Sequence, residues 1–240
     1  MFYEWNENAI RWFYAASEYT GFHRKLAELC LPHLTAGGTL ADFGCGLGLV
    51  DLELAGRMSH VTCIDRNAVP LKELERESKR RGVVNLSVMQ ADCQELTGQW
   101  DNVVTAFYGK GAELLDLFLP RCRHQVVAAV RADGAGAFSP DRSNNHRLLE
   151  QTEQALKDRG AVYLAQPAAL EYGQPLESRE DGAAFVRARC RDVPEAAVED
   201  YLDANLAAID HPRWPWYLPN RKEFTLFVLP RGENGHLICR

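Results

Sequence analysis

Three alternating glycines, Gly44, Gly46 and Gly48, follow an apolar run that contains Asp42, and a helical pattern begins at Leu49. Glycines let the backbone turn tightly and approach a ligand that a side chain would block. The first turn of the following helix offers unpaired N–H groups to such a ligand. A strand, a glycine turn and a helix in this order therefore indicate a nucleotide-type pocket rather than an ordinary loop.

Two further acids follow the next two apolar segments. Asp65 ends the segment 61–65, and Asp92 closes the segment 86–90 after Ala91. A carboxylate at the first position can accept both hydroxyl hydrogens of a ribose, and one at the second can accept from an adenine amino group. An aspartate at a strand end also commonly caps a helix or a turn, so each acid has a structural alternative.

Apolar runs and helical periodicity alternate along the chain. Strands are predicted over 39–43, 61–65, 86–90, 100–107, 125–130, 161–171 and 224–229. Helices are predicted over 8–34 with a break at Thr20–Gly21, and over 49–55, 69–81, 113–119, 144–159, 179–191 and 194–209. This alternation predicts an α/β fold of parallel strands with right-handed crossovers, whose ligands bind beyond the carboxyl ends of the strands.

Composition narrows the classes of protein further. With 240 residues, 46% of them hydrophobic, the chain can bury the core of one large α/β domain. The net charge is −6 and like charges form no long run, which disfavours nucleic acid as a partner. Seven cysteines lie singly with no CxxC pair, as expected of reduced, mostly buried thiols. No secretory signal, membrane span or metal site is predicted, and we expect a cytoplasmic protein.

The glycine turn with its preceding acid, together with Ile64-Asp65 and Ala91-Asp92, resembles the class I S-adenosylmethionine-dependent methyltransferases over residues 39–131. The resemblance implies a Rossmann-like, seven-stranded, mostly parallel sheet with an antiparallel last strand. It also implies S-adenosylmethionine as cofactor and S-adenosylhomocysteine as product. The cofactor-binding residues that we predict on this basis are Asp42, Gly44, Cys45, Gly46, Asp65, Arg66, Asp92, Cys93 and Phe107.

The resemblance implies one methyltransferase domain with helical additions. Residues 1–35 would form an N-terminal helical cap, 36–165 the cofactor-binding core, 166–222 a helical and aromatic lid insertion, and 223–231 the last strand. In this family Asp42 would organise the methionine amino group, Gly44 and Gly46 would admit its carboxylate, and Asp65 and Asp92 would hold the ribose and the adenine. Cys45 and Cys93 are interpreted as small buried fillers rather than nucleophiles.

Three other functions remain open. A dinucleotide-binding dehydrogenase is disfavoured because Leu49 stands where its third glycine would be, and because Asp42 would repel a pyrophosphate. An aminopropyl transferase would need a compact acidic cluster near Tyr108, which the sequence lacks. A protein that binds the cofactor as a sensor, without catalysis, is the third alternative.

Methyl transfer requires that the acceptor lie in line with the methyl carbon and that water be excluded. The Asn/Asp-Pro-Pro-aromatic signature of many nucleic-acid and amino-group methyltransferases is absent at residues 106–110, so we predict a small-molecule acceptor. Tyr108 and His146 are the candidates for a catalytic role. Phe107 is predicted to pack on the adenine, and both Phe107 and Tyr108 have the alternative of capping the core.

Aromatic residues are frequent in the two predicted helical additions. Those that could line the acceptor site are Tyr14, Tyr19, Trp214, Trp216 and Tyr217. The last three belong to 211–219, a segment rich in proline that we predict to be a stiff loop. The alternative is that these side chains fasten the lid to the sheet or form a homodimer contact.

Overall fold

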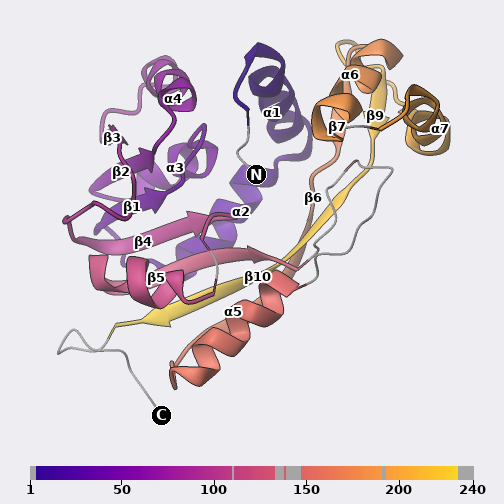
Figure 1. Ribbon diagram of the computed structural model, residues 1–240. Coiled ribbons are helices and arrows are strands. Elements are labelled where there is room, and N and C mark those ends of the chain that lie inside the picture. Colours follow the sequence, from indigo (N-terminus) through magenta and orange to yellow (C-terminus); the bar gives the residue numbers. More distant parts are fainter. Residues whose placement is uncertain (1–3, 110, 133–137, 139–146, 191–192, 232–240) are drawn as a thin grey trace. The chain divides into compact units, whose positions relative to one another are not determined.

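The computed structural model describes residues 4–109, 111–132, 138, 147–190 and 193–231, which form two compact units (Figure 1). The core unit comprises His23–Ala132, Arg147–Ala168 and Phe224–Arg240. The second unit comprises Met1–Phe22, Asp133–His146 and Ala169–Glu223. Each unit is therefore assembled from segments that lie far apart in the sequence.

A seven-stranded sheet has the order β3-β2-β1-β4-β5-β10-β6 (Figure 1). Its strands are β1 (Thr39–Phe43), β2 (His60–Asp65), β3 (Leu86–Gln90), β4 (Trp100–Ala106), β5 (Cys122–Arg131), β6 (Leu164–Glu171) and β10 (Arg221–Pro230). The pairs from β3 through β5 are parallel, and β10 pairs antiparallel with β5. The predicted α/β fold, with a mostly parallel sheet and an antiparallel last strand, is confirmed.

The central strands are apolar because helices and loops cover the sheet. Leu40, Val103 and Val127 on β1, β4 and β5 have almost no exposed surface. Strands buried on both faces carry continuous apolar runs rather than alternating ones. This burial explains why the sequence pattern placed these strands well.

Four helices belong wholly or mainly to the core unit: α2 (Phe22–Cys30), α3 (Leu49–Leu54), α4 (Ala68–Arg81) and α5 (Arg147–Asp158). The Asn67 side chain caps α4 by accepting from the Val69 N–H at 2.9 Å, and Gly82 ends the helix with a φ of 68°. Three basic residues occupy the last turn, where they favour the negative end of the helix dipole. These signals explain why 69–81 was predicted almost to the residue.

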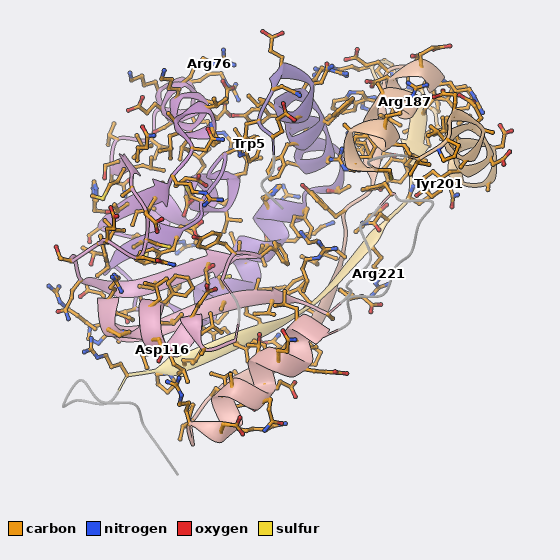
Figure 2. The ribbon with its side chains drawn as sticks, in the orientation of Figure 1. Trp5, Arg76, Asp116, Arg187, Tyr201 and Arg221 are labelled. Carbon is orange, nitrogen blue, oxygen red and sulfur yellow. The ribbon has the colours of Figure 1, made fainter. Side chains whose placement is uncertain are left out.

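The segment between β4 and β5 departs from the predicted helix at 113–119. A π-type turn covers Leu114–Phe118 and a 3₁₀ turn covers Leu119–Arg121. Pro120 has no N–H to donate, so an α-helix cannot continue through it. Asp116, which Figure 2 labels, lies on this segment. Its carboxylate accepts a hydrogen bond from Arg159, which follows α5, at 2.6 Å.

The second unit combines three helices, α1 (Glu7–Thr20), α6 (Arg179–Arg189) and α7 (Glu195–Asn205), with a small antiparallel sheet. That sheet has the order β7-β9-β8, from β7 (Gln174–Leu176), β8 (Ala207–Ala208) and β9 (Trp216–Leu218). Arg187 of α6 donates to Glu195 of α7 at 2.9 Å (Figure 2). The apolar core of the unit is formed by Trp12, Phe138, Leu176, Ala183, Phe185, Val186, Cys190, Val198, Leu202 and Leu218.

One predicted feature of this unit needs correction. The segment 211–219 is not only a loop, because β9 lies within it and pairs with β7 and β8. Within the predicted N-terminal cap 1–35, α2 groups with the core unit and buries Leu26, Ala27 and Cys30, and the division into cap, core and lid stays a prediction. The predicted break at Thr20–Gly21 is confirmed, since Gly21 caps α1 with a φ of 65°.

Three further predictions concern cysteines, membranes and metals. The six described cysteines are free thiols, and Cys239 lies outside the described residues. Within the described part of the chain, no helix is long and apolar enough to cross a bilayer. The same residues contain no group of three or more His, Cys, Asp or Glu side chains that could hold a metal ion.

Asp181 on α6 is expected to be the polar group on which the second unit depends most. Its carboxylate accepts from Arg11 at 2.5 Å and from the Trp12 indole at 2.9 Å, both on α1. Burial raises the pKa of Asp181, but these hydrogen bonds outweigh burial and lower it overall. Asp181→Asn should therefore cost about 2–3 kcal/mol of unfolding free energy at neutral pH, measured by urea unfolding followed by tryptophan fluorescence.

Asp203→Asn is the matched control, because Asp203 accepts from Arg179 at 2.6 Å but its side chain is 70% exposed. An exposed ion pair contributes about 0.2–1 kcal/mol, so this change should have little effect. Since the pKa of Asp181 is lowered on folding, its contribution is present above about pH 4 and is lost as pH falls through the folded value. Equal losses in the two variants would contradict the assignment.

Candidate functional site

The turn after β1 is formed by backbone rather than by side chains. Gly44, Gly46 and Gly48 have φ values of 77°, 56° and 60°, which L side chains rarely adopt. The N–H groups of Gly44 and Cys45 donate to the Ile64 carbonyl oxygen at 2.8 and 3.1 Å. The end of β2 therefore fixes the position of the turn.

Asp65, the last residue of β2, contributes both carboxylate oxygens to the same region. Oδ2 accepts from the Gly46 N–H at 3.0 Å, and Oδ1 accepts from the Asn67 N–H at 2.9 Å. The side chain thus connects the glycine turn with the start of α4. Each oxygen has a further lone pair for another donor, and the role of Asp65 in binding ribose stays a prediction.

Asp92 follows β3 and is exposed. Its Oδ1 accepts from the Gln94 N–H at 2.9 Å, which closes a short turn. The carboxylate keeps its second oxygen for another donor, as adenine binding would require. That role also stays a prediction.

The two cysteines beside the turns have the properties of packing residues. The Cys45 thiol lies 3.6 Å from the Gly46 carbonyl oxygen, and Cys93 is 5% exposed. Burial raises the pKa of both thiols above the ordinary value. A reactive thiolate needs a lowered pKa, so neither thiol is activated as a nucleophile.

Tyr108, after β4, lies against the glycine turn. A Cβ atom built on Gly44 would be 2.3 Å from Cγ and 2.7 Å from Cβ of Tyr108, so the ring occupies the space that the missing side chain leaves. The Tyr108 hydroxyl lies 3.0 Å from the Cys93 thiol. Tyr108 therefore extends from the turn after β1 to the loop after β3, the two places predicted to hold opposite ends of the cofactor.

The environment of Tyr108 disfavours it as a catalytic base. Burial, followed by the contact with Cys93, raises the pKa of the Tyr108 phenol, against the opposing effect of the nearby Arg66 guanidinium. A general base should have a pKa near the working pH, and this phenol stays protonated there. His146, the other catalytic candidate, lies outside the described residues.

Phe107 packs on β10, and its predicted contact with adenine stays a prediction. Phe107 has a φ of 64°, and its ring packs edge-to-face on Phe224 with centroids 5.6 Å apart. Phe224 is on β10, which is separated from β4 by β5. Asp92 follows β3, the outermost strand on the other side of β4. Tyr108 rather than Phe107 is therefore the aromatic residue that reaches the loop after β3.

A second buried acid accompanies Asp42, and the sequence analysis missed it. Asp42 is 2% exposed, and Asp51 on α3 is completely buried. Burial, then the neighbouring Asp51 carboxyl, raises the pKa of Asp42 well above its usual range. Burial also raises the pKa of Asp51. The sequence signal was an acid inside the otherwise apolar start of α3, next to Val50 and Leu52.

The predicted acceptor-lining aromatics pack largely within the second unit. Trp214 and Tyr217 are 2% and 7% exposed, and Tyr19 lies 6.3 and 4.9 Å from their ring centroids. The Tyr217 hydroxyl donates to Glu171 at 2.5 Å. Trp216 packs on the apolar core of the unit, and Tyr14 is half-buried on α1. These contacts hold the aromatic residues together within the second unit, and their role in lining the acceptor site stays a prediction.

The groups at this edge of the sheet fit S-adenosylmethionine. The cofactor donates hydrogen bonds from an ammonium group, two ribose hydroxyls and an adenine amino group, and carboxylates accept such bonds. Asp42 has a buried oxygen, Oδ1, with no hydrogen-bond partner among the described residues. Asp65 and Asp92 end or follow the two neighbouring strands. Three carboxyl groups are therefore available for the ammonium group, the ribose diol and the adenine amino group, and this pairing stays a prediction.

A glycine substitution tests whether Tyr108 packs on the turn. Gly44→Ala introduces both a strained backbone at φ 77° and a methyl group against Tyr108, whereas Gly37→Ala introduces strain at φ 70° with open space around it. Backbone strain costs of order 1–3 kcal/mol and overpacking a further 1–3 kcal/mol. Gly44→Ala should thus be the more destabilising by at least about 1 kcal/mol.

Thermal and urea unfolding of both variants measure this difference. Adding Tyr108→Ala to Gly44→Ala should restore part of the loss, and a double-mutant cycle isolates the coupling. Equal destabilisation at Gly44 and Gly37, with no coupling to Tyr108, would show that the ring does not rest on the turn.

Comparison with known proteins places this site in a family. Residues 40–134 match the family described as "Methyltransferase domain". The chain is 33% identical over 91 residues to a protein of Methanothermobacter thermautotrophicus described as "Probable cobalt-precorrin-6B C(15)-methyltransferase (decarboxylating)". That match covers 37% of the chain and 47% of the relative. The chain therefore spans about half the length of the curated relative that it matches.

Solved structures share the fold over most of the chain. The precorrin 8W decarboxylase of Methanobacterium thermoautotrophicum has a TM-score of 0.52 at 18% identity, over 85% of this chain and 89% of that one. A geranyl diphosphate methyltransferase in complex with SAM has a TM-score of 0.51 at 16% identity, over 87% and 85%. Over residues 40–134 the chain thus matches the family described as a methyltransferase domain, and the predicted resemblance to the class I S-adenosylmethionine-dependent methyltransferases is confirmed.

Proposed function

We propose that the protein transfers a methyl group from S-adenosylmethionine to a small-molecule acceptor by direct in-line displacement. One observation carries the proposal: β1, β2 and β3 are neighbouring parallel strands, and Asp42, Asp65 and Asp92 lie at or just beyond their carboxyl ends. Ligands of open α/β sheets bind at this edge. The glycine turn lies at the same edge and belongs to the part of the chain that matches the family.

Each acid has a distinct part in holding the cofactor. Asp42 faces the ammonium group from behind the turn, Asp65 accepts from the ribose hydroxyls, and Asp92 accepts from the adenine amino group. When bound, S-adenosylmethionine supplies an activated methyl group on a sulfonium. The chain's own task is then to hold the acceptor in line and to exclude water.

Tyr108 is the residue best placed to act at the centre of this site. Its ring lies on Gly44 and its hydroxyl reaches Cys93, so it borders both predicted ends of the cofactor. As a neutral phenol it can donate one hydrogen bond and accept another, but it does not remove a proton from the acceptor. An acceptor that ionises readily, or one that carries no proton on its nucleophilic atom, suits such a site.

The proposal that the acceptor is a small molecule rests on the net charge of the chain and on the descriptions of the relatives. The net charge is −6, and a nucleic-acid partner requires a basic surface. The relatives named above are described as acting on precorrins or on geranyl diphosphate. Both are small molecules, and we extend only that class to this chain.

Asp92 gives the cleanest test of cofactor binding. Asp65 also holds the Gly46 and Asn67 amides, so its replacement would disturb the turn, whereas the Asp92 side chain accepts one exposed hydrogen bond from the residues that the structure describes. Asp92→Ala should weaken S-adenosylhomocysteine binding about tenfold or more, since a charge-assisted hydrogen bond contributes about 1.5–3 kcal/mol. Isothermal calorimetry measures the dissociation constants.

Glu95→Gln is the control, because Glu95 lies in the same exposed segment and its N–H donates to the Asp92 carbonyl oxygen through the backbone. Its affinity should match the wild type. Transfer of a labelled methyl group from S-adenosylmethionine into a small-molecule extract tests catalysis separately. Binding without transfer would favour a sensor, and the absence of binding to cofactor-stripped wild-type protein would refute the proposal.

A further inference from the structure

Asp42 and Asp51 form an acid pair beneath the glycine turn. Asp42 is at the end of β1 and Asp51 is on α3, immediately after the turn, with exposures of 2% and 0%. Oδ1 of Asp42 and both side-chain oxygens of Asp51 have no hydrogen-bond partner among the described residues. The Asp51 carboxyl is among the groups that raise the pKa of Asp42, so the two side chains act as neighbours.

A proton shared between Asp42 and Asp51 would give their unpartnered carboxylate oxygens a hydrogen-bond donor. Two ionised carboxylates repel each other, and neither has a hydrogen to donate, so both would remain buried without a partner. One proton turns the pair into an acid that donates to a carboxylate and leaves a single buried negative charge. Acids held side by side in this way titrate as a unit, with one proton retained to higher pH than either acid would keep alone.

The groups around the pair act in both directions on the proton. Burial raises the pKa of Asp51, whereas the nearby Cys63 thiol and the backbone favour its ionised form and lower that pKa. The Cys30 thiol on α2, the Cys45 thiol on the turn and the Cys63 thiol on β2 are neutral, because burial raises their pKa. Asp65 at the end of β2 adds another negative charge that acts on Asp42. Burial of the pair is the larger effect, and it raises the pKa of Asp51 to about 6.

We propose that Asp51 is a positioning residue of the cofactor site: it shares a proton with Asp42 in the ligand-free protein, and the pair releases that proton when an ammonium-bearing ligand binds at the glycine turn. This inference rests on the proposed function. A positive charge near Asp42 favours the ionised form of the pair. The proton passes to solvent, no bond other than O–H is broken, and the pair changes from one negative charge to two as the ammonium arrives.

Proton release on binding fixes the direction in which ligand affinity depends on pH. Because binding releases a proton, affinity for the ligand should rise with pH across the titration of the pair, by up to tenfold per pH unit for one full proton. Asp51→Asn keeps the size of the side chain and supplies a permanent N–H donor to Asp42. It removes the shared proton, so affinity should become independent of pH over the same interval.

Calorimetry with S-adenosylhomocysteine tests the proposal at several pH values between about 5 and 8. Titrations in two buffers of different ionisation enthalpy give the number of protons released. The wild type should release a substantial fraction of one proton, and Asp51→Asn should release none. Glu53→Gln is the control on the same helix. Glu53 is partly exposed and forms an ion pair with Arg81, so it does not belong to the Asp42–Asp51 pair. This variant should behave as the wild type.

A measurement without ligand separates this inference from the proposed function. A raised folded pKa means that the native pair binds more protons than the unfolded chain, so wild-type stability should fall as pH rises through that value. Asp51→Asn should flatten this dependence in urea unfolding, and Asp51→Ser serves the same purpose should the amide fail to fold. Failure of the wild type to bind the ligand would refute the proposed function while the unfolding profile still tests the pair. Binding without proton release, with the same pH profile in wild type and Asp51→Asn, would overturn the inference.

Discussion

The glycine turn has no side chains with which to fix its own conformation, and the neighbouring strand fixes it instead. In the parallel register of β1 and β2, Phe43 is opposite Ile64, which brings the end of β2 beside the start of the turn. The Ile64 carbonyl then accepts two turn amides, and Asp65 accepts a third. The position of α3, the packing of Tyr108 against the glycine turn and the burial of Asp42 all depend on this register. A slip by one residue would remove every one of these contacts.

Unfavourable features of the core unit gather at the same edge of the sheet. Phe107 adopts a left-handed backbone conformation, and the Asp42–Asp51 pair holds buried charge. Such features persist only where the surrounding structure determines them, and they commonly mark functional sites. The opposite end of the sheet shows no such conflict at Asp101, whose carboxylate accepts from the backbone and the hydroxyl of Thr39. The contrast supports a ligand site at the carboxyl ends of the strands.

Local signals in the sequence were sufficient for the parallel sheet, for α4 and for the break at Gly21, because apolar runs and caps act over a few residues. They were insufficient for β9, whose partner β7 is distant in the sequence and whose pairing depends on the assembled second unit. They also did not predict the left-handed backbone conformation of Phe107. Asp51 was missed for a different reason. A single acid in a helix is ordinarily solvent-facing, and only the packing of α3 buries it.

The structural and functional interpretations of the strand-end acids do not compete. A carboxylate offers about four lone-pair sites, and the turn amides use two at Asp65 and one at Asp92. A carboxylate that accepts from turn amides therefore keeps lone pairs for a ligand. The amide hydrogen bonds also orient those lone pairs before the ligand binds. Asp42 differs, because its buried Oδ1 has no hydrogen-bond partner among the described residues and the Asp51 carboxyl acts on it. In the proposed pair a shared proton, rather than a turn amide, orients the Asp42 side chain.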